Sequence, residues 1–177
     1  LIIGGGVLGL EMAWGLKQLG KDVIVVEALP RLMPKQLDNL GSEILLDIVQ
    51  GSDVKVLTGT QVREITGDFS VTGFITDKDE KYPCDMVIHC TGIRPNIELV
   101  KDTGIYTNRG VLVNERMETN IPGIYAAGDI AEYNNQIPGL WNVASLQGEV
   151  AGNNIAGSHK VYEVPISPVA MNAYHYS

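Results

Sequence analysis

The stretch Ile2-Ile3-Gly4-Gly5-Gly6-Val7-Leu8-Gly9-Leu10-Glu11 decides the fold, because an apolar run meets a glycine turn that opens directly into a helical pattern. Gly4, Gly6 and Gly9 have G-x-G-x-x-G spacing, in which the first permits a tight turn and the second lets a pyrophosphate approach the backbone. The third lets helix and strand pack closely, and the N–H groups that begin the helix face the phosphates. The stretch therefore predicts a dinucleotide site.

An acidic residue stands where such a site needs one. Residues 23–26 predict a second strand, buried on both faces, and Glu27 closes it 18 residues after Gly9. A carboxylate there accepts hydrogen bonds from the adenosine ribose hydroxyls. We therefore expect NADH to be preferred over NADPH, whose 2′-phosphate would meet a like charge. Arg31 is the competing feature, because it follows in the loop and is long enough to turn toward a phosphate.

Apolar spacing predicts two helices against the sheet. Gly20 is expected to end the first helix, and Asp38 and Gly51 are expected to begin and end the second. The side chains expected to face the sheet are Leu8, Met12, Leu16 and Leu19 in the first helix and Leu37, Leu40, Ile44 and Ile48 in the second. Residues 54–57 predict a third strand, which gives a βαβαβ order.

The pattern changes after residue 60. Residues 61–66, 69–76 and 81–82 have the composition of short strands broken by polar turns, so they predict an antiparallel meander in place of a crossover helix. Residues 86–90 return to a buried strand, in which His89 is expected to be packed and hydrogen-bonded. We expect the first domain to end near residue 92.

Beyond this boundary the sequence predicts a mixed region. Its expected elements are a short helix at 97–102, a strand at 111–113, a buried strand that ends in Gly128-Asp129, a helix from about 141 to 156, and a strand-like tail from 161 that includes Pro165 and Pro168. Trp141, which opens the long helix, is expected in the core or near a cofactor.

Composition narrows the class of protein. The chain has 177 residues, 45% of them hydrophobic, and a formal net charge of −8, which argues against nucleic acid as a partner. No apolar run reaches the roughly 18 residues of a membrane helix. Cys84 and Cys90 make no disulfide framework, so we expect a cytoplasmic protein. Because the chain begins inside a strand without Met, we expect it to be a piece of a longer protein.

Three motifs in order resemble the FAD-dependent pyridine nucleotide oxidoreductases, a superfamily with two dinucleotide folds. It includes rubredoxin and ferredoxin reductases, the flavin part of nitrite reductases, NADH oxidases and disulfide reductases. The motifs are the turn at 4–11, the hinge-like Thr91-Gly92-Ile93-Arg94-Pro95-Asn96, and Thr119-Asn120-Ile121-Pro122-Gly123-Ile124-Tyr125-Ala126-Ala127-Gly128-Asp129. The resemblance covers nearly all of the chain, with Cys90 where the family usually has Ala.

The resemblance implies an α/β fold: a Rossmann-like parallel sheet with an antiparallel β-meander, followed by part of an FAD-binding domain. Residues 1–92 would be the NAD(H)-binding domain, 93–160 the C-terminal half of the FAD-binding domain, and 161–177 the start of a C-terminal interface domain. Only one glycine fingerprint is present, whereas FAD binding in the family starts from its own fingerprint upstream. The chain alone should hold NAD better than FAD.

The resemblance also implies which residues contact each cofactor. Those implied for NAD(H) are Gly4, Gly5, Gly6, Val7, Leu8, Gly9, Glu11 and Glu27, those at the hinge are Thr91 and Gly92, and those for FAD are Gly128, Asp129 and Ala144. Asp129 would accept a hydrogen bond from a ribityl hydroxyl, and the helix at 144–148 would meet the flavin ring. The alternatives are that Asp129 caps the next turn, that Glu11 is an ordinary acid of a first helical turn, and that residues 144–148 only pack.

The activity implied is transfer of hydride from NADH to FAD and on to an acceptor, of the rubredoxin- or nitrite-reductase type. The acceptor would be a small redox protein such as rubredoxin or an attached redox domain. The alternatives are an NADH oxidase, peroxidase or disulfide reductase and, from another class, a nucleotide-binding module without turnover. We assign no catalytic side chain and no metal site, because His159 and His175 lack partners at ligand spacing and neither cysteine is expected to react.

Overall fold

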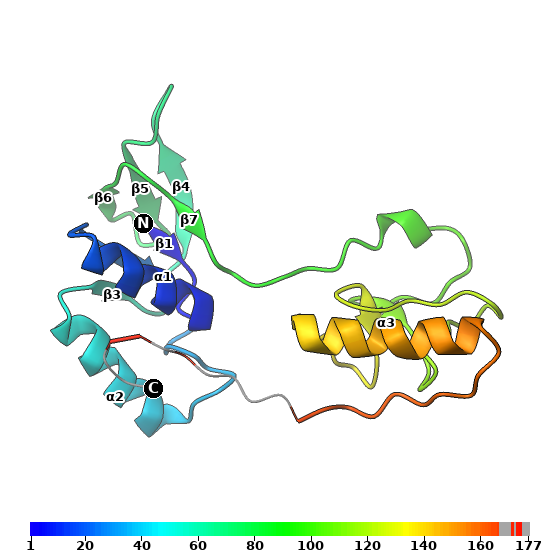
Figure 1. Cartoon of the computed structure of the whole chain (residues 1–177). Coiled ribbons are helices and arrows are strands. Elements are labelled where there is room, and N and C mark those ends of the chain that lie inside the picture. Colours follow the sequence, from blue (N-terminus) through cyan, green and yellow to red (C-terminus); the bar gives the residue numbers. More distant parts are fainter. Residues whose placement is uncertain (167–170, 172, 175–177) are drawn as a thin grey trace. The chain divides into compact units, whose positions relative to one another are not determined.

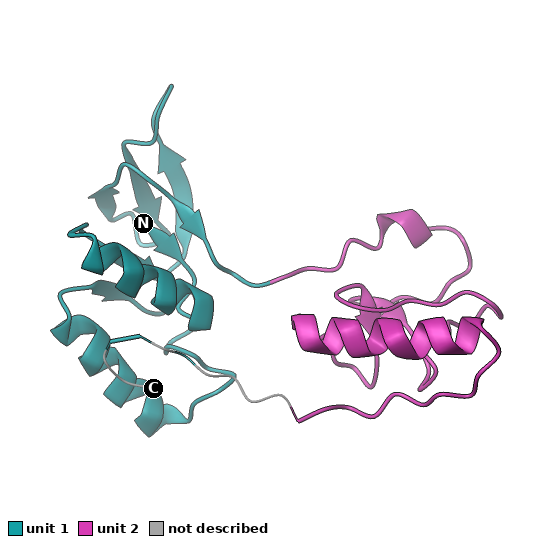
Figure 2. Cartoon of the chain, in the orientation of Figure 1, with its two compact units in different colours: residues 1–92, 169–177 teal, residues 93–168 magenta. Residues whose placement is uncertain are grey.

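A computed structural model describes residues 1–166, 171, 173 and 174. Expectations for Pro168 and His175 lie outside the described residues. The chain divides into two units, which Figure 2 shows in different colours: residues 1–92 with 169–177, and residues 93–168.

The first unit is built on a parallel sheet, and helices α1 and α2 lie side by side against it (Figure 1). Its elements are β1 (Ile2–Ile3), α1 (Val7–Gln18), β2 (Ile24–Val26), α2 (Asn39–Gly51), β3 (Lys55–Leu57) and β7 (Ile88–His89). The strand order is β3-β2-β1-β7, with every pair parallel, so that β1 lies between β2 and β7. The predicted fold class is confirmed, and the glycine turn begins where the inner strand β1 ends.

The face that α1 turns to the sheet differs from the prediction. Leu10 and Ala13 are fully buried, whereas Leu8 and Leu19 are 71% and 72% exposed and Met12 is 43% exposed. The predicted stripe was therefore wrong at three of its four positions. The reason is the glycine turn, because Gly9 must approach the backbone of the turn and thereby rotates Leu8, Met12 and Leu19 to the opposite side of the helix.

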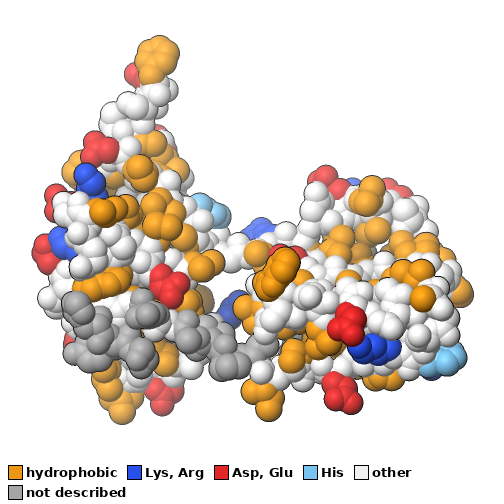
Figure 3. All heavy atoms as spheres, viewed as in Figure 1, with side chains coloured by type: hydrophobic (Ala, Val, Ile, Leu, Met, Phe, Trp, Pro, Cys, Tyr) orange, Lys and Arg blue, Asp and Glu red, His pale blue; other side chains and the backbone are white. Residues whose placement is uncertain are grey.

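Helix α2 shows the same kind of difference. Asp38 begins it as predicted, since its Oδ1 accepts a hydrogen bond from Gly41 N at 2.8 Å. Leu45 and Val49 are buried against the sheet, whereas Leu40 and Ile44 of the predicted stripe are exposed. Figure 3 shows such exposed hydrophobic side chains on both units.

The meander of the first unit agrees with the prediction. Strands β4 (Val62–Thr66), β5 (Gly73–Thr76) and β6 (Lys81–Pro83) form an antiparallel sheet in the order β4-β5-β6. The rings of Phe74 and Tyr82 stack between β5 and β6, with centroids 5.2 Å apart.

The second unit has little regular structure besides one long helix. Its elements are η1 (Glu98–Val100), β8 (Val111–Leu112), β9 (Ala131–Glu132) and α3 (Trp141–Ile155), and β8 pairs with β9 in parallel. Its core consists of Met117, Val143, Val150, Ala151 and Tyr162. Residues 161–166, expected to be strand-like, form no strand.

In the second unit, the strand expected to end in Gly128-Asp129 and a place for Trp141 in the core are wrong, whereas a place for Trp141 near a cofactor stays a prediction. Residues 123–129 form an irregular segment, in which Tyr125 makes one isolated bridge to Glu118, because among the described residues no strand lies along this segment. Trp141 is 88% exposed and so does not belong to the core.

The end of the described chain returns to the first unit. Tyr174 is 2% exposed, its hydroxyl donates to Leu10 O at 3.0 Å, and its ring centroid lies 5.1 Å from that of Trp14. A residue from the far end of the sequence thus completes the core around α1. Among the described residues, no helix combines the length and apolarity needed to span a bilayer.

Candidate functional site

Two glycines give the turn after β1 its shape. Gly4 has a φ of +115°, and a Cβ on it would lie 2.4 Å from Cys90 O, so a side chain there is excluded by conformation and by contact. A Cβ on Gly9 would lie 2.0 Å from Gly4 O, so the start of α1 sits directly on the turn. Gly4 N donates to Val26 O at 2.8 Å, which joins the turn to the end of β2.

Gly6 leaves an open space at the same place. It is the residue that precedes α1, and no heavy atom lies within 4 Å of the position that its Cβ would occupy. The first N–H groups of a helix lack partners inside it and attract an anion. The turn therefore has room for a phosphate beside the first N–H groups of α1.

Glu27 reaches directly onto this turn. Its Oε2 accepts a hydrogen bond from Gly5 N at 2.7 Å, and its Oε1 accepts one from Leu29 N at 2.8 Å. A carboxylate has about four lone-pair sites, so two remain for the hydroxyls of a ribose. The sequence predicted that Glu27 ends β2, but not that its carboxylate would hold Gly5.

Arg31 turns away from Glu27. Its guanidinium donates to Pro34 O at 3.1 Å, to Leu37 O, and to Ser42 Oγ at 3.3 Å. All three acceptors belong to the loop before α2 or to its first turn. The guanidinium of Arg31, which the sequence left as a possible phosphate ligand, is thus bound to groups of its own loop and of the first turn of α2.

The other residues predicted to contact NAD(H) follow the turn into α1. Val7 is half-buried at the start of the helix and Leu8 is exposed. Glu11 is half-buried and lies beyond the first turn, since α1 begins at Val7. The alternative that Glu11 is an ordinary acid of the first helical turn therefore does not fit its position.

The hinge-like residues follow β7. Thr91 and Gly92 are both exposed, and Thr91 Oγ1 lies 3.1 Å from Nε2 of His89. His89 is itself exposed, so the prediction that it is packed was wrong, whereas the predicted hydrogen bond is present. In a strand of two residues that pairs on one side with β1, the side chain of His89 is left at the surface.

Both cysteines are free thiols. Burial raises the pKa of Cys84, with a smaller contribution from Asp85, and burial alone raises the pKa of Cys90. Since the thiolate is the reactive form, both side chains are poor nucleophiles near neutral pH.

The residues predicted to contact FAD come together in the second unit. Gly128 has a φ of +83°, and its N–H donates to Gln147 Oε1 at 2.8 Å, which ties the Gly-Asp motif to α3. A Cβ on Gly128 would lie 3.5 Å from the Cβ of Ala144. Asp129 is exposed. The sequence placed Gln147 in the segment expected near the flavin, but sequence reasoning missed its hydrogen bond to Gly128.

Glu132 is a second residue that sequence reasoning missed. Its buried carboxylate accepts hydrogen bonds from Asn108 Nδ2, Arg109 N and Gly110 N, each at 2.9 Å. Burial acts to raise the pKa of Glu132, but these three hydrogen bonds and the charge of Arg109 outweigh it and lower the pKa. Glu132 lies three residues after Asp129, and its carboxylate holds the loop that precedes β8.

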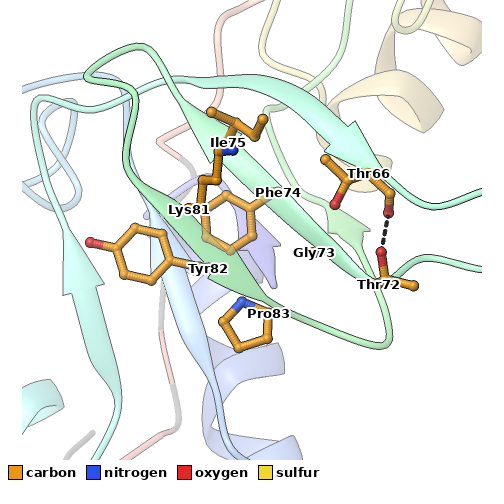
Figure 4. A pocket seen from close by; sticks show the side chains of 8 residues that line it. All are labelled: Thr66, Thr72, Gly73, Phe74, Ile75, Lys81, Tyr82 and Pro83. Atoms are coloured by element: carbon orange, nitrogen blue, oxygen red, sulfur yellow. Dashed lines mark hydrogen bonds between the residues drawn. The ribbon is translucent and has the colours of Figure 1, made fainter.

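One open hollow lies apart from these residues. It has a volume of about 290 Å³ on the meander sheet, and Figure 4 shows the side chains around it. Its lining consists of Thr66, Thr72, Gly73, Phe74, Ile75, Lys81, Tyr82 and Pro83. Within the described ranges, no group of three or more His, Cys, Asp or Glu residues is arranged to hold a metal ion.

Comparison with known proteins identifies the family of this chain. Residues 1–148 match the family described as pyridine nucleotide-disulphide oxidoreductase. The chain belongs to this family. It is 41% identical to an NADH oxidase of Methanocaldococcus jannaschii, over 96% of this chain and 39% of that protein. It is 38% identical to an NADH-rubredoxin oxidoreductase of Clostridium acetobutylicum, over 95% of this chain and 41% of that protein.

Solved structures of the family have the same fold. A NAD-dependent persulfide reductase from A. fulgidus superposes with a TM-score of 0.88 at 31% identity, over 97% of this chain and 33% of that one. The chain spans about 40% of the length of the two curated relatives named above.

Proposed function

We propose that this chain is the NAD(H)-binding domain and part of the FAD-binding domain of a flavoprotein oxidoreductase. The intact protein would pass a hydride from NADH to FAD and then pass electrons to an acceptor. The observation that carries the proposal is the carboxylate of Glu27 on Gly5 N, beside the open space at Gly6. This arrangement offers a nucleotide both a phosphate site and a ribose site.

Each residue of the turn has a part in holding NADH. Gly4 and Gly9 keep the backbone close, Gly6 leaves room for the pyrophosphate, and Glu27 accepts hydrogen bonds from the ribose. Glu11 would lie beside the nicotinamide end. Bound NADH and FAD supply the redox chemistry, and the side chains position them, so we assign no catalytic residue to this chain.

Residues of the second unit would hold part of the FAD. The exposed carboxylate of Asp129 suits a ribityl hydroxyl, because Gln147 fixes the backbone of Gly128 beside it. Ala144 begins the part of α3 proposed to approach the flavin ring, and Thr91 and Gly92 would link the two cofactor sites. We further propose that residues 1–92 bind NAD(H), that 93–160 form the C-terminal half of the FAD domain, and that 161–177 begin an interface domain, of which Tyr162 packs in the core of the second unit and Tyr174 in that of the first.

For the acceptor we propose a rubredoxin- or nitrite-reductase type of reaction, with a small redox protein or an attached redox domain as partner. The likeness to an NADH-rubredoxin oxidoreductase supports it. The alternative, an NADH oxidase, peroxidase or disulfide reductase, is favoured by the likeness to an NADH oxidase. A net charge of −8 supports the absence of a nucleic-acid partner, and two free thiols support a cytoplasmic location.

The test is anaerobic reduction of the intact protein by NADH. Bleaching of the flavin absorbance, followed by reoxidation with rubredoxin but slow reoxidation with oxygen or disulfides, is the expected result. Fast reoxidation by oxygen would favour the oxidase. A flavin that NADH does not bleach would overturn the enzyme and leave a nucleotide-binding module.

Cofactor preference tests the part played by Glu27. Titration of the intact protein with both reduced nucleotides should give at least about tenfold tighter binding of NADH, about 1.4 kcal/mol. The 2′-phosphate of NADPH would meet the carboxylate, while Arg31 is held elsewhere. Glu27→Arg should narrow or reverse the preference. Equal or tighter binding of NADPH by the unaltered protein would contradict this assignment.

The open space at Gly6 gives a second test. Gly6→Ala places a methyl group where no protein atom lies within 4 Å, so the fold should be unchanged. The methyl group would occupy the approach of the pyrophosphate, and the affinity for NADH should fall about tenfold or more. An unchanged affinity would place the phosphates elsewhere.

A further inference from the structure

The loop between β2 and α2 supports the glycine turn from outside. The side chain of Leu32 is 1% exposed, and its Cδ2 lies 2.5 Å from the position that a Cβ on Gly5 would occupy. Met33 N donates to Gly5 O at 3.1 Å. Gly5 is therefore held on one side by the carboxylate of Glu27 and on the other by this loop.

Met33 adopts an uncommon backbone conformation in order to make this contact. Its φ is +44°, in the left-handed region that residues other than glycine rarely occupy. Such a conformation persists only where neighbouring contacts determine it, and it is concentrated at functional sites. The loop thus needs something that holds it in place.

Arg31 supplies these contacts. Its guanidinium donates to Pro34 O and Leu37 O, on the far side of Met33, and to the hydroxyl of Ser42 in α2. The same hydroxyl donates to Leu32 O at 2.7 Å. Arg31 and Ser42 together therefore bind the backbone on both sides of the strained residue, and the forked guanidinium suits several acceptors at once.

We propose that Arg31 is a positioning residue for the nucleotide turn: it braces the loop at Leu32 and Met33 and thereby keeps Gly5 in place for NADH. It does not recognise a 2′-phosphate, because reaching one would leave Pro34 O and Leu37 O without their donor. The inference rests on the proposed function, to which it adds a residue that shapes the site without touching the nucleotide.

The two roles predict different changes when Arg31 is replaced in the intact protein. If Arg31 braces the loop, Arg31→Gln should raise the Kd for NADH and for NADPH by the same factor, about tenfold, with kcat at saturation unchanged. Arg31→Lys keeps the charge but not the forked guanidinium, so its Kd for each nucleotide should lie between that of the unaltered protein and that of Arg31→Gln. Lys35→Gln removes an exposed cation of the same loop and should change neither Kd.

Amide hydrogen exchange measures the brace without a nucleotide. Arg31→Gln should speed exchange at Met33 N, which donates to Gly5 O, at least about tenfold, while the amide of Val49 in α2 stays unchanged. Ser42→Ala removes the shared hydroxyl and should act in the same direction with a smaller effect. It also keeps the test decisive if Arg31→Gln does not fold.

Two results would overturn the proposal. One is a loss confined to NADPH, which would make Arg31 a phosphate ligand. The other is unchanged exchange at Met33 in both Arg31→Gln and Ser42→Ala. If the unaltered protein bound neither nucleotide, the proposed function would fail, whereas the exchange measurement would still decide whether Arg31 braces the loop.

Discussion

The glycine turn of the first unit and the Gly-Asp segment of the second have one feature in common. Each contains a glycine with a positive φ, Gly4 in the first and Gly128 in the second. They differ in how many contacts hold them. Gly4 donates to β2, and Gly5 is bound by Glu27 and by Met33. Gly128 is tied to Gln147, while Asp129 beside it is exposed.

The difference teaches how much of a binding site a short stretch of sequence can specify. The turn is shaped by a four-stranded parallel sheet that lies within the same unit. The Gly-Asp segment lies beside β8 and β9, which pair over two residues each. The turn is therefore fixed by several contacts within its own unit, whereas fewer contacts hold the Gly-Asp segment.

The largest effect should come from Gly4→Ala. The new methyl group would lie 2.4 Å from Cys90 O in a backbone with a φ of +115°, so the first unit should lose about 3 kcal/mol or more of stability. Amide exchange, resolved by residue, should show the loss in the first unit and not in the core around α3.

The control for this variant is Gly15→Ala in α1 of the same unit. Nothing lies within 4 Å of the Cβ position of Gly15, so alanine there should stabilise α1 by about 0.5–1 kcal/mol. If Gly4→Ala sped amide exchange equally in both units, the predicted confinement of its effect to the first unit would be wrong.

Glu132→Gln should give the next largest effect, because an amide cannot accept from every donor that faces the carboxylate. We expect the second unit to lose about 2–3 kcal/mol in denaturant unfolding at pH 7. Glu149→Gln, at an exposed carboxylate paired with Lys160, should cost less than about 1 kcal/mol. Equal losses from the two variants would contradict the assignment.

The same variant predicts a pH dependence. Since the pKa of Glu132 is lowered in the folded state, its contribution is present above the ordinary value of 4.5 and is lost as the pH falls through the lowered value. The gap between the unaltered protein and Glu132→Gln should therefore shrink in acid. A gap that stays constant from pH 7 to pH 3 would refute this.

Asp129→Ala sharpens the comparison at the second site. Loss of a charge-assisted hydrogen bond costs about 1.5–3 kcal/mol, so the intact protein should retain FAD roughly ten- to a hundredfold more weakly after dialysis. NADH binding should be unchanged, and Asp129→Asn, which keeps one acceptor, should show a smaller loss. Full flavin content in Asp129→Ala would favour the alternative that Asp129 caps the turn.

The smallest effect is expected from Tyr174→Phe. It removes the hydroxyl that donates to Leu10 O, which should cost about 1 kcal/mol at pH 8. Burial raises the pKa of Tyr174 to about 12, so the stability that the neutral phenol gives is present below pH 10 and is lost as the pH rises from 10 toward 12. The free energy of unfolding of the unaltered protein should therefore exceed that of Tyr174→Phe at pH 8 but not at pH 11.

The sequence predicted those parts of the molecule that depend on neighbouring residues. The glycine spacing, Asp38 as a helix cap and the meander each rest on a few positions, and the structure bears them out. The helix stripes were wrong because Leu8 and Leu40 are apolar yet exposed, and the face of a helix is chosen by a contact such as that of Gly9 with the turn.

Other features could not be predicted, because their partners are backbone atoms or distant residues. Arg31 binds carbonyl groups, which every residue carries, so no pattern of side chains marks its role. Residues 123–129 have the composition of a strand but no neighbouring strand among the described residues. Glu132 and Gln147 are polar residues whose burial appears only in three dimensions.

The return of Tyr174 to α1 has a consequence for how the protein is made. Its hydroxyl bonds to a residue 164 positions earlier, so translation at about 5–20 residues per second leaves roughly ten to thirty seconds between the two. During that interval the nascent first unit lacks its last core residue while the whole of the second unit leaves the ribosome. The core of the first unit around α1 is therefore completed only after the second unit has been synthesised.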